Sequence, residues 1–375
     1  MLPDMDRRAL LWMSLAALPT RLAAQGGGVR QRALQFPADF GAHPETRIEW
    51  WYATGWLHGA ADTSPAAPPT FGFQITFFRS RTGVPTTHPS RFAASQVIFA
   101  HAALTDLGQR RLRHDQRIAR SGFGIAGTDE GDTNVLLRDW RLRRSGPAEA
   151  SVYSAQVASD GAGFALALSL TTTQPLLLQG AAGYSRKGPS TEQASHYYSQ
   201  PQLNVVGTLK LGGRAQAVRG RAWLDHEWSD SLLDPQAVGW DWIGMNLADG
   251  SALTAFRLRR ADGSSLYAGG SFRAPEAAGA AGVSARNFGP DEVRLVPGRT
   301  WTSASSRAVY PVEWRVETPA GNFAVKALLD NQELDSRGST GTIYWEGLSE
   351  LRDRAGRVVG HGYLEMTGYS GRLSL

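Results

Sequence analysis

Acidic residues embedded in aromatic segments are the feature of this sequence that most constrains how the chain can fold. Glu49 is the first example, and four large aromatic side chains share its segment: Trp50, Trp51, Tyr52 and Trp56. Burial of a carboxylate is costly unless the group is paired, hydrogen-bonded or protonated. The same pattern recurs in later segments, at 222–228, 239–242 and 344–346. This recurrence predicts a common site that collects buried acids and aromatic rings.

The composition favours an all-β protein. The chain of 375 residues contains 42 glycines and 12 tryptophans, and it has few convincing amphipathic helices. From residue 48 onward, alternating apolar and polar residues predict about fifteen short strands separated by turn signals. This number exceeds one small barrel and fits two antiparallel barrels packed together. A link rich in Gly and Arg at 212–221 suggests one barrel over residues 45–218 and another over residues 219–375.

The N-terminus has the pattern of a secretory signal peptide. Arg7 and Arg8 precede an apolar stretch at 9–18, and small residues near position 24 suit cleavage. The arginine pair is compatible with twin-arginine export. We therefore expect a signal peptide over residues 1–24, an irregular lead-in over residues 25–44, and a mature protein that is periplasmic or secreted. The sequence contains no cysteine, which excludes disulfides and a thiol nucleophile.

Motifs spread along the chain carry a family resemblance: His43-Pro44, Glu49–Gly55, Ala100–Asp106, Tyr197–Pro201, Ala222–Trp228, Gly239–Gly250, Tyr310–Trp314 and Tyr363–Tyr369. In this order they resemble the AttH-like family of secreted proteins, which is related to carotenoid 1,2-hydratase. The resemblance implies two lipocalin-like β-barrel domains and a hydrophobic small molecule, isoprenoid- or lipid-like, as the partner. It implies no cofactor. A ligand derived from a membrane also implies transient contact with a membrane surface.

Hydration of an unactivated alkene requires protonation to a carbocation, which water then captures. An apolar pocket keeps the acid protonated because burial raises the pKa of a carboxyl group. Aromatic faces stabilise the cation. Strand alternation places Asp225 and Glu227 on one face and His226 on the other. Asp225 is our first candidate for the proton donor, with Glu227 or His226 tuning it. Asp241 is a further catalytic candidate, and the resemblance also implies an aspartate donor.

The same segments supply the candidate ligand-binding residues. We expect the ligand to contact Glu49, Trp50, Trp51, Tyr52, His101, Tyr198, Trp228, Trp240, Trp242 and Glu346. Alternation groups Glu49 with Trp51 on one face of their strand, and Trp50 with Tyr52 on the other.

Other interpretations of these acids stay open. Acids at barrel ends often pair with arginine, so Glu49, Glu346 and Glu365 could instead have structural roles, and arginines suited to this are Arg47, Arg221, Arg257 and Arg259. A lipocalin-like barrel could also be a non-catalytic lipid or isoprenoid carrier, or a hydrolase of a hydrophobic ester. The sequence lacks the Gly-x-Ser-x-Gly elbow of an ordinary serine hydrolase on an α/β fold.

Metal and nucleic-acid functions are less consistent with the sequence. The eight histidines show no metal-ligand spacing, so no metal site is predicted. A site formed by His101, His196 and His226 remains an alternative. The net charge of +5 comes from scattered arginines without a basic helix, which argues against nucleic acid as a partner.

Overall fold

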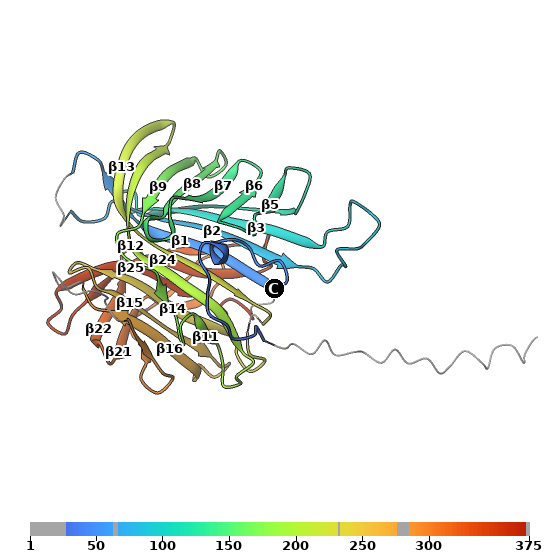
Figure 1. Cartoon of the computed structure of the whole chain (residues 1–375). Coiled ribbons are helices and arrows are strands. Elements are labelled where there is room, and N and C mark those ends of the chain that lie inside the picture. The colour runs from blue at the N-terminus through green and yellow to red at the C-terminus, as the bar shows by residue number, and fades with distance from the viewer. Residues whose placement is uncertain (1–27, 63–66, 232, 276–284, 373–375) are drawn as a thin grey trace, which may run out of the picture.

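The computed structural model describes residues 28–62, 67–231, 233–275 and 285–372. The predicted signal peptide at 1–24 lies outside the described residues, as do residues 25–27 of the predicted lead-in. Strands dominate the regular structure, which confirms the all-β prediction, and the short helices η1 (Ala38–Phe40) and η2 (Ala148–Ala150) add single turns (Figure 1). Within the described ranges, no helix is long and apolar enough to span a bilayer.

The first barrel is a sheet of thirteen antiparallel strands: β1 (Ile48–Gly59), β2 (Phe71–Arg81), β3 (Gln96–Asp106), β4 (Arg111–Arg120), β5 (Ala126–Thr128), β6 (Asn134–Leu137), β7 (Trp140–Ser145), β8 (Val152–Ser159), β9 (Phe164–Thr171), β10 (Leu177–Leu178), β11 (Tyr184–Arg186), β12 (Ala194–Leu211) and β13 (Arg214–Ser229). Its main path runs β4-β3-β2-β1-β13-β12-β9-β8-β7-β6-β5. The path curls back on itself, since its first strand β4 contacts β6, the strand next to its other end, and Arg117 of β4 donates a hydrogen bond to the Ala158 carbonyl of β8 (2.8 Å).

The second barrel is a sheet of ten strands: β14 (Gly239–Leu247), β15 (Ala252–Arg259), β16 (Ser265–Arg273), β17 (Ala285–Phe288), β18 (Arg294–Pro297), β21 (Glu313–Thr318), β22 (Gly321–Ala327), β23 (Glu333–Asp335), β24 (Ile343–Arg352) and β25 (Val358–Met366). Its path runs β17-β16-β15-β14-β25-β24-β22-β21-β18. Strands β19 (Thr300–Thr302) and β20 (Val309–Pro311) form a separate hairpin. The structure thus has the two lipocalin-like barrels that the resemblance implied.

Each barrel has its own apolar core, built from alternate residues of its strands. Trp51 of β1 and Leu224 of β13 belong to the core of the first barrel. Ile243 and Met245 of β14 belong to the core of the second, together with Trp345 of β24. The intervening residues of these strands point out of their barrels, yet most of them are buried as well.

The outward residues are buried because the two barrels pack against each other through these strands (Figure 1). Strand β1 contacts β25, and β13 contacts β14. Tyr52 and Trp223 of the first barrel form one cluster with Trp242 and Tyr363 of the second. Gln202 adds polar links, since its backbone N–H donates to Asn246 Oδ1 (2.8 Å) and its Nε2 donates to the Leu247 carbonyl (2.9 Å).

The change from one sheet to the other falls between Ser229 and Gly239. The boundary placed at 218/219 therefore lies inside β13. The reason is strand pairing: β13 is hydrogen-bonded along its length to β1, which brings Asp225 opposite Tyr52. The acid segment at 222–228 thus belongs to the first barrel and lies where that barrel meets the second.

Several strands escaped the alternation pattern, the longest being β4 and the first half of β12. Strand β4 (Arg111–Arg120) consists mostly of polar and charged residues, and no side chain in it is fully buried, so no apolar face marks it in the sequence. The first half of β12 contains Pro201, which normally argues against a central strand. A shift of the pairing register between Gln200 and Leu203 accommodates this proline.

Gly55 and Gly59 of β1 provide a test of this packing. A Cβ atom on Gly55 would lie 2.2 Å from the Arg221 carbonyl oxygen of β13, whereas a Cβ atom on Gly59 would meet nothing within 4 Å. We expect Gly55→Ala to lower the free energy of unfolding by about 1–3 kcal/mol, because β1 and β13 must separate. Gly59→Ala is the matched control and should leave it unchanged or slightly raised. Chemical denaturation measures both, and equal effects would contradict the assigned pairing.

Candidate functional site

A cavity of about 1090 Å³, including the space at its mouth, lies between the two barrels. Its first wall is the outward face of β1, β2 and β13, and its second wall comes from β14, β15, β24 and β25. Large rings dominate the lining: Trp50, Tyr52, Phe78, Trp240, Trp242 and Phe256. Four carboxyl groups also line it, those of Asp225, Glu227, Glu346 and Glu365. The cavity is therefore an apolar, aromatic space that contains several acids.

Asp225 is buried in the wall of this cavity and is surrounded by neutral donors. Its Oδ2 accepts a hydrogen bond from the Tyr197 hydroxyl (2.8 Å). Its Oδ1 accepts from the Ser199 hydroxyl (2.5 Å) and from the Trp223 indole N–H (2.6 Å). Burial raises the pKa of Asp225 to about 7, because desolvation outweighs these three hydrogen bonds. Near neutral pH this carboxyl group can therefore carry a proton.

Glu227 lies two residues along the same face and has a cationic partner. Lys187 Nζ lies 3.1 Å from its Oε1, and the Ser195 hydroxyl donates to the same oxygen (2.5 Å). The Lys187 ammonium also lies 4.4 Å from the ring centre of Tyr197. Asp225 and Glu227 thus differ in their surroundings, since only Glu227 has an ammonium group within ion-pair distance among the described residues.

Glu346 and Glu365 form a facing pair on the second wall. They are direct partners across β24 and β25, and Glu346 is buried while Glu365 is partly buried. Burial, together with repulsion from Glu365, raises the pKa of Glu346 well above its usual range. Burial also raises the pKa of Glu365 to about 7, against a hydrogen bond with Trp240. Two carboxyl groups this close in an apolar space hold at least one proton between them near neutral pH.

His101 lies on the first wall and is neutral. Burial lowers the pKa of His101 to about 3. Its Nδ1 is hydrogen-bonded to the Tyr344 hydroxyl (2.8 Å) and its Nε2 to the Ser339 hydroxyl (2.8 Å). The same tyrosine accepts a hydrogen bond from Gln74 Nε2 (3.0 Å), which connects the two walls. His101 therefore joins the barrels and is poorly placed to act as an acid.

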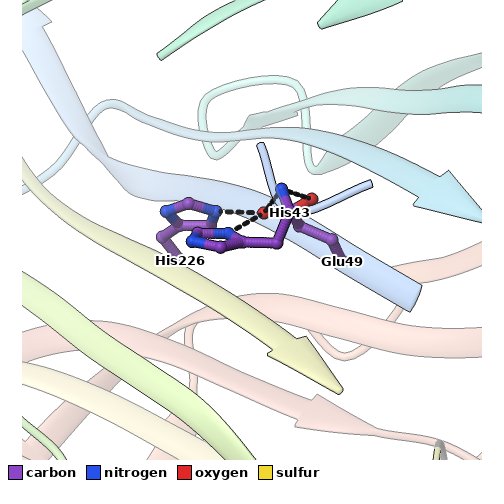
Figure 2. Close-up of side chains that lie close together, drawn as sticks. All are labelled: His43, Glu49 and His226. Atoms are coloured by element: carbon purple, nitrogen blue, oxygen red, sulfur yellow. Dashed lines mark hydrogen bonds and ion pairs between the residues drawn. The ribbon is translucent and has the colours of Figure 1, made fainter. Parts of the chain in front are cut away.

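A second group of acids and histidines lies on the opposite, inward face of β1 and β13. Figure 2 shows the side chains of His43, Glu49 and His226 pointing toward one another. Glu49 Oε1 lies 2.8 Å from His43 Nδ1 and 2.9 Å from His226 Nε2. Glu49 Oε2 accepts hydrogen bonds from Arg79 Nε (2.8 Å) and from the His43 backbone N–H (2.9 Å). Glu49 is completely buried, so all of its hydrogen bonds are internal.

These partners fix the protonation states of the group. Burial opposes the ionisation of Glu49, but hydrogen bonds from His226 and His43 outweigh it and hold the pKa of Glu49 well below its usual range. Burial lowers the pKa of His226 and would lower that of His43 too, but Asp39 and Glu49 raise the pKa of His43 overall. His43 is therefore an imidazolium between two carboxylates, and His226 is a neutral donor to Glu49.

The ligand-type atoms of His43, Glu49 and His226 lie within 4.8 Å of one another, as in a metal site. However, every ring nitrogen already has a partner, since His43 Nε2 contacts Asp39 (2.9 Å) and His226 Nδ1 contacts the Tyr198 hydroxyl (3.0 Å). The guanidinium group of Arg79 would also repel a metal cation. The group therefore fits a hydrogen-bond network better than a metal centre. The alternative site of His101, His196 and His226 does not assemble, because His101 faces the cavity and His226 faces the barrel interior.

The structure divides the predicted site residues between these two faces. Those that line the cavity are Asp225, Glu227, Trp50, Tyr52, His101, Trp240, Trp242 and Glu346. Those that lie elsewhere are His226, Asp241, Glu49, Trp51, Tyr198 and Trp228. Asp241 is paired with Arg257 Nε (2.7 Å) and accepts from the Tyr369 hydroxyl (2.9 Å). Trp51 stacks on His226, and Trp228 stacks on His43. The expectation of one common site is corrected, because neighbouring residues of a strand point to opposite faces.

Comparison with known proteins identifies the family. A profile described as AttH-like matches residues 28–369. The chain belongs to the AttH-like family. The crystal structure of a candidate AttH from Nitrosomonas europaea has 47% identity and a TM-score of 0.80, with 91% of this chain and 98% of that chain covered. Kievitone hydratase from Nectria haematococca has 14% identity and a TM-score of 0.63, with 92% and 98% covered, which shows a shared fold. A comparison with curated proteins gives no match.

In this AttH-like chain, the cavity also contains polar residues that were not predicted as site residues, among them Gln74, Lys187, Tyr197 and Glu365. Tyr197 was passed over in favour of its neighbour Tyr198, although β12 pairs with β13 so that Tyr197 and Asp225 share a face. Glu365 could have been found from alternation within its motif. Lys187 gives no sequence signal, because it lies in a loop that only the fold brings to Glu227.

The network around Glu49 should dominate the stability of the first barrel. We expect Glu49→Gln to lower the free energy of unfolding at neutral pH by about 3–5 kcal/mol, because Arg79 and His43 lose their buried counterion. Since the pKa of Glu49 is depressed by folding, its contribution is present above about pH 4 and is lost as the pH falls further. Urea denaturation over a pH series should show a weaker acid dependence in the variant.

The exposed residue Glu45 provides the control, because Glu45→Gln removes a carboxylate from the same segment without touching the buried network. It should leave the stability near that of the wild type. A Glu49→Gln protein as stable as the Glu45→Gln protein would contradict the structural role assigned to the network.

Proposed function

We propose that this AttH-like protein binds an elongated apolar molecule, isoprenoid- or lipid-like, between its barrels and hydrates a carbon–carbon double bond by acid catalysis. The observation that carries the proposal is Asp225, a carboxylic acid with a pKa raised to about 7 in the wall of an aromatic cavity. Ligand cavities of proteins are of this kind, mostly apolar with a few polar groups. A hydratase with the same fold shows that two such barrels can support hydration.

The proposed reaction begins with transfer of the Asp225 proton to the less substituted carbon of the double bond. The π electrons form the new C–H bond, which leaves a carbocation on the more substituted carbon and a carboxylate on Asp225. A water molecule then attacks the cation to form the C–O bond. The excess proton of the resulting oxonium ion returns to the Asp225 carboxylate. The alkene and water become an alcohol, and the acid is regenerated.

The cavity contains groups that would stabilise the positive charge of the carbocation. The faces of aromatic rings carry negative potential, and Trp50, Trp240 and Trp242 line the same cavity as Asp225. Once Asp225 has given up its proton, its carboxylate lies beside the cation. The apolar lining limits the number of competing water molecules. These groups act on the transition state more strongly than on a neutral alkene, which is the condition for catalysis.

The N-terminal sequence adds a proposal about location. A positively charged start, an apolar stretch and small residues near position 24 support export to the periplasm or beyond the cell. A ligand of low water solubility would then reach the cavity from a membrane or a carrier.

Replacement of Asp225 tests the chemistry. We expect Asp225→Asn to lower turnover of an isoprenoid alkene by at least about a hundredfold, since general acid catalysis contributes on that order. Binding of the alkene should be retained, because the side chain keeps its size. Gas chromatography with mass spectrometry of the alcohol formed from farnesene measures turnover, and Asp291→Asn, an exposed acid, is the matched control.

The proposed hydration activity should fall as the pH rises. The protonated acid is the active form and its pKa is raised to about 7, so activity should be present below that pH and decline as the pH rises through it. Full turnover by Asp225→Asn would remove Asp225 from the mechanism. Tight binding of farnesene with no alcohol formed by the wild type at any pH would favour a non-catalytic carrier.

A further inference from the structure

Three polar side chains on the cavity wall each have a buried atom that no protein group satisfies. They are Tyr52, Gln74 and Glu346, each less than a tenth exposed. Within the described residues, the Tyr52 hydroxyl, Gln74 Oε1 and Glu346 Oε1 make no hydrogen bond of normal geometry, although the Tyr52 and Glu346 side chains interact with each other. Buried polar atoms in native proteins almost always have a partner. Three unsatisfied atoms in the lining of one cavity therefore require an explanation.

The three groups come from both barrels and are held in place. Tyr52 of β1 and Gln74 of β2 belong to the first barrel, and Glu346 of β24 belongs to the second. The Gln74 amide is oriented because its Nε2 donates to the Thr76 hydroxyl (3.1 Å) and to the Tyr344 hydroxyl (3.0 Å), which leaves Oε1 free. Burial, the charges of Glu346 and Glu365, and a hydrogen-bonding interaction with Glu346 raise the pKa of Tyr52, so Tyr52 and Glu346 face each other in the cavity.

We propose that Tyr52, Gln74 and Glu346 form a subsite for a hydroxyl oxygen, either that of the water to be added or that of a hydroxyl group on the ligand. The phenol donates a hydrogen bond, and the amide oxygen accepts one. A hydroxyl oxygen can serve both at once, which neither a hydrocarbon nor an ether can do. The inference rests on the proposed function, because in a hydration the oxygen of the water becomes the hydroxyl oxygen of the product.

The position of this subsite relative to Asp225 supports its role. Tyr52 and Asp225 are direct partners across β1 and β13. Asp225 and Tyr52 lie on the first wall, while Glu346 lies on the second. An alkene between the walls would then have the proton donor and the oxygen subsite within the same part of the cavity. Tyr52, Gln74 and Glu346 are assigned as positioning and specificity residues, and none of them donates the proton in the first step.

The unsatisfied atoms give the proposal a signature that a structural role would not give. A buried polar atom without a partner destabilises the free protein, so its removal should not lower stability. Tyr52→Phe and Glu346→Leu should therefore unfold at temperatures no lower than the wild type. Both should nevertheless lose discrimination between an alcohol and a hydrocarbon. Replacement of a residue needed only for folding would instead lower the unfolding temperature and leave the discrimination between an alcohol and a hydrocarbon unchanged.

The experiment compares two sesquiterpenes of similar size: nerolidol, a tertiary alcohol, and farnesene, a hydrocarbon. Quenching of the intrinsic tryptophan fluorescence measures the affinity of each. The wild type should bind nerolidol at least about tenfold more tightly, because hydrogen bonds in the complex replace unsatisfied atoms. Tyr52→Phe and Glu346→Leu should reduce this preference to about onefold to threefold. Tyr184→Phe, which removes a hydroxyl bonded to the Thr191 carbonyl outside the cavity, should retain it.

The outcomes separate this inference from the proposed function. Equal affinity of the wild type for both compounds, or a preference that survives in both variants, overturns the subsite alone. If the wild type binds neither compound, the proposed ligand class fails and the subsite fails with it. A lower kcat of Tyr52→Phe on farnesene at unchanged KM assigns the subsite to the added water. A change confined to nerolidol affinity assigns it to a hydroxyl carried by the ligand.

An independent feature lies on the surface of the first barrel, where aromatic and basic side chains protrude together. Phe92 is 73% exposed and Phe123 is 51% exposed, and their rings stack with centres 5.6 Å apart. The Arg120 guanidinium lies 4.3 Å from the centre of the Phe123 ring, and Arg91 lies 5.9 Å from it. Neither arginine forms an ion pair with an acid in the described part of the chain. We call these four residues the arginine–phenylalanine tip.

The backbone holds the tip in this exposed form. Phe123 has a φ of 59°, a left-handed conformation that is unusual for a bulky residue, and it lies between two glycines with positive φ. Phe92 lies in the long loop between β2 and β3, which extends beyond the body of the barrel (Figure 1). The tip thus combines exposed apolar rings, which are unfavourable in water unless another surface covers them, with cations that have no acid partner in the described residues.

We infer that the arginine–phenylalanine tip docks on an anionic lipid surface. The charge is complementary, since Arg91 and Arg120 would face lipid phosphates while the two rings enter the boundary between headgroups and acyl chains. The position is suitable as well. The cavity lining includes Ile48, the first residue of β1. Ile48 pairs with Ser80 near the end of β2, and the long loop begins directly after β2. A docked tip would bring the cavity near the source of an apolar ligand.

Vesicle sedimentation tests the docking. The wild type should sediment with vesicles of phosphatidylglycerol and phosphatidylcholine, and raised salt should release it. The double variants Phe92→Ser/Phe123→Asn and Arg91→Glu/Arg120→Glu should bind at least about tenfold more weakly. Val206→Ser and Arg214→Glu remove an exposed apolar and a basic side chain elsewhere, and they should bind as the wild type does. Binding unaffected by the tip variants, or sedimentation of the protein without vesicles, would overturn the inference.

Discussion

The structure depends on one packing constraint: two barrels meet through the outer faces of strands whose inner faces are already filled. In an isolated barrel, the outward residues of a strand face water. Here β1 and β13 are buried on both faces, because β14 and β25 cover them. Every polar group on these strands must therefore find an internal partner or remain unsatisfied. The partners of the buried acids differ between the two faces, although Glu227 on the cavity face has Lys187 as a cation, and this difference determines the chemistry.

On the inner faces of the barrels, the buried acids are paired with cationic side chains. Glu49 has Arg79 and the imidazolium of His43, so the pKa of Glu49 is held well below its usual range. Asp241 likewise has Arg257 at 2.7 Å. On the face toward the cavity, Asp225 and Glu365 have only neutral partners, and burial raises the pKa of each to about 7. The positions of a few arginines thus decide which buried acids are ionised and which retain a proton.

The sequence predicts much of this arrangement and omits the part that depends on contacts between distant segments. Alternation correctly separates Asp225 from its neighbour His226, because the direction of a side chain is a local property of a strand. It does not indicate which face is covered by a second barrel. Trp50 and Trp51 are equivalent in the sequence, yet one lines the cavity and the other packs inside the first barrel. The same limit placed the domain boundary inside β13, whose partner strand β1 is far away in the chain.

The inner face and the cavity face of these strands differ in how well their polar groups are satisfied. This difference indicates why evolution could have retained each set of polar groups. The network around Glu49 is satisfied in all its hydrogen bonds, so stability alone explains it. The cavity face is different, because protonated acids and the unpaired atoms of Tyr52 and Glu346 lower the stability of the free protein. Apolar residues of similar size would pack there at lower cost. Such a face persists where a bound molecule completes its hydrogen bonds or takes up its proton. We therefore propose that this chain acts at the cavity between the barrels, and not in the interior of either barrel.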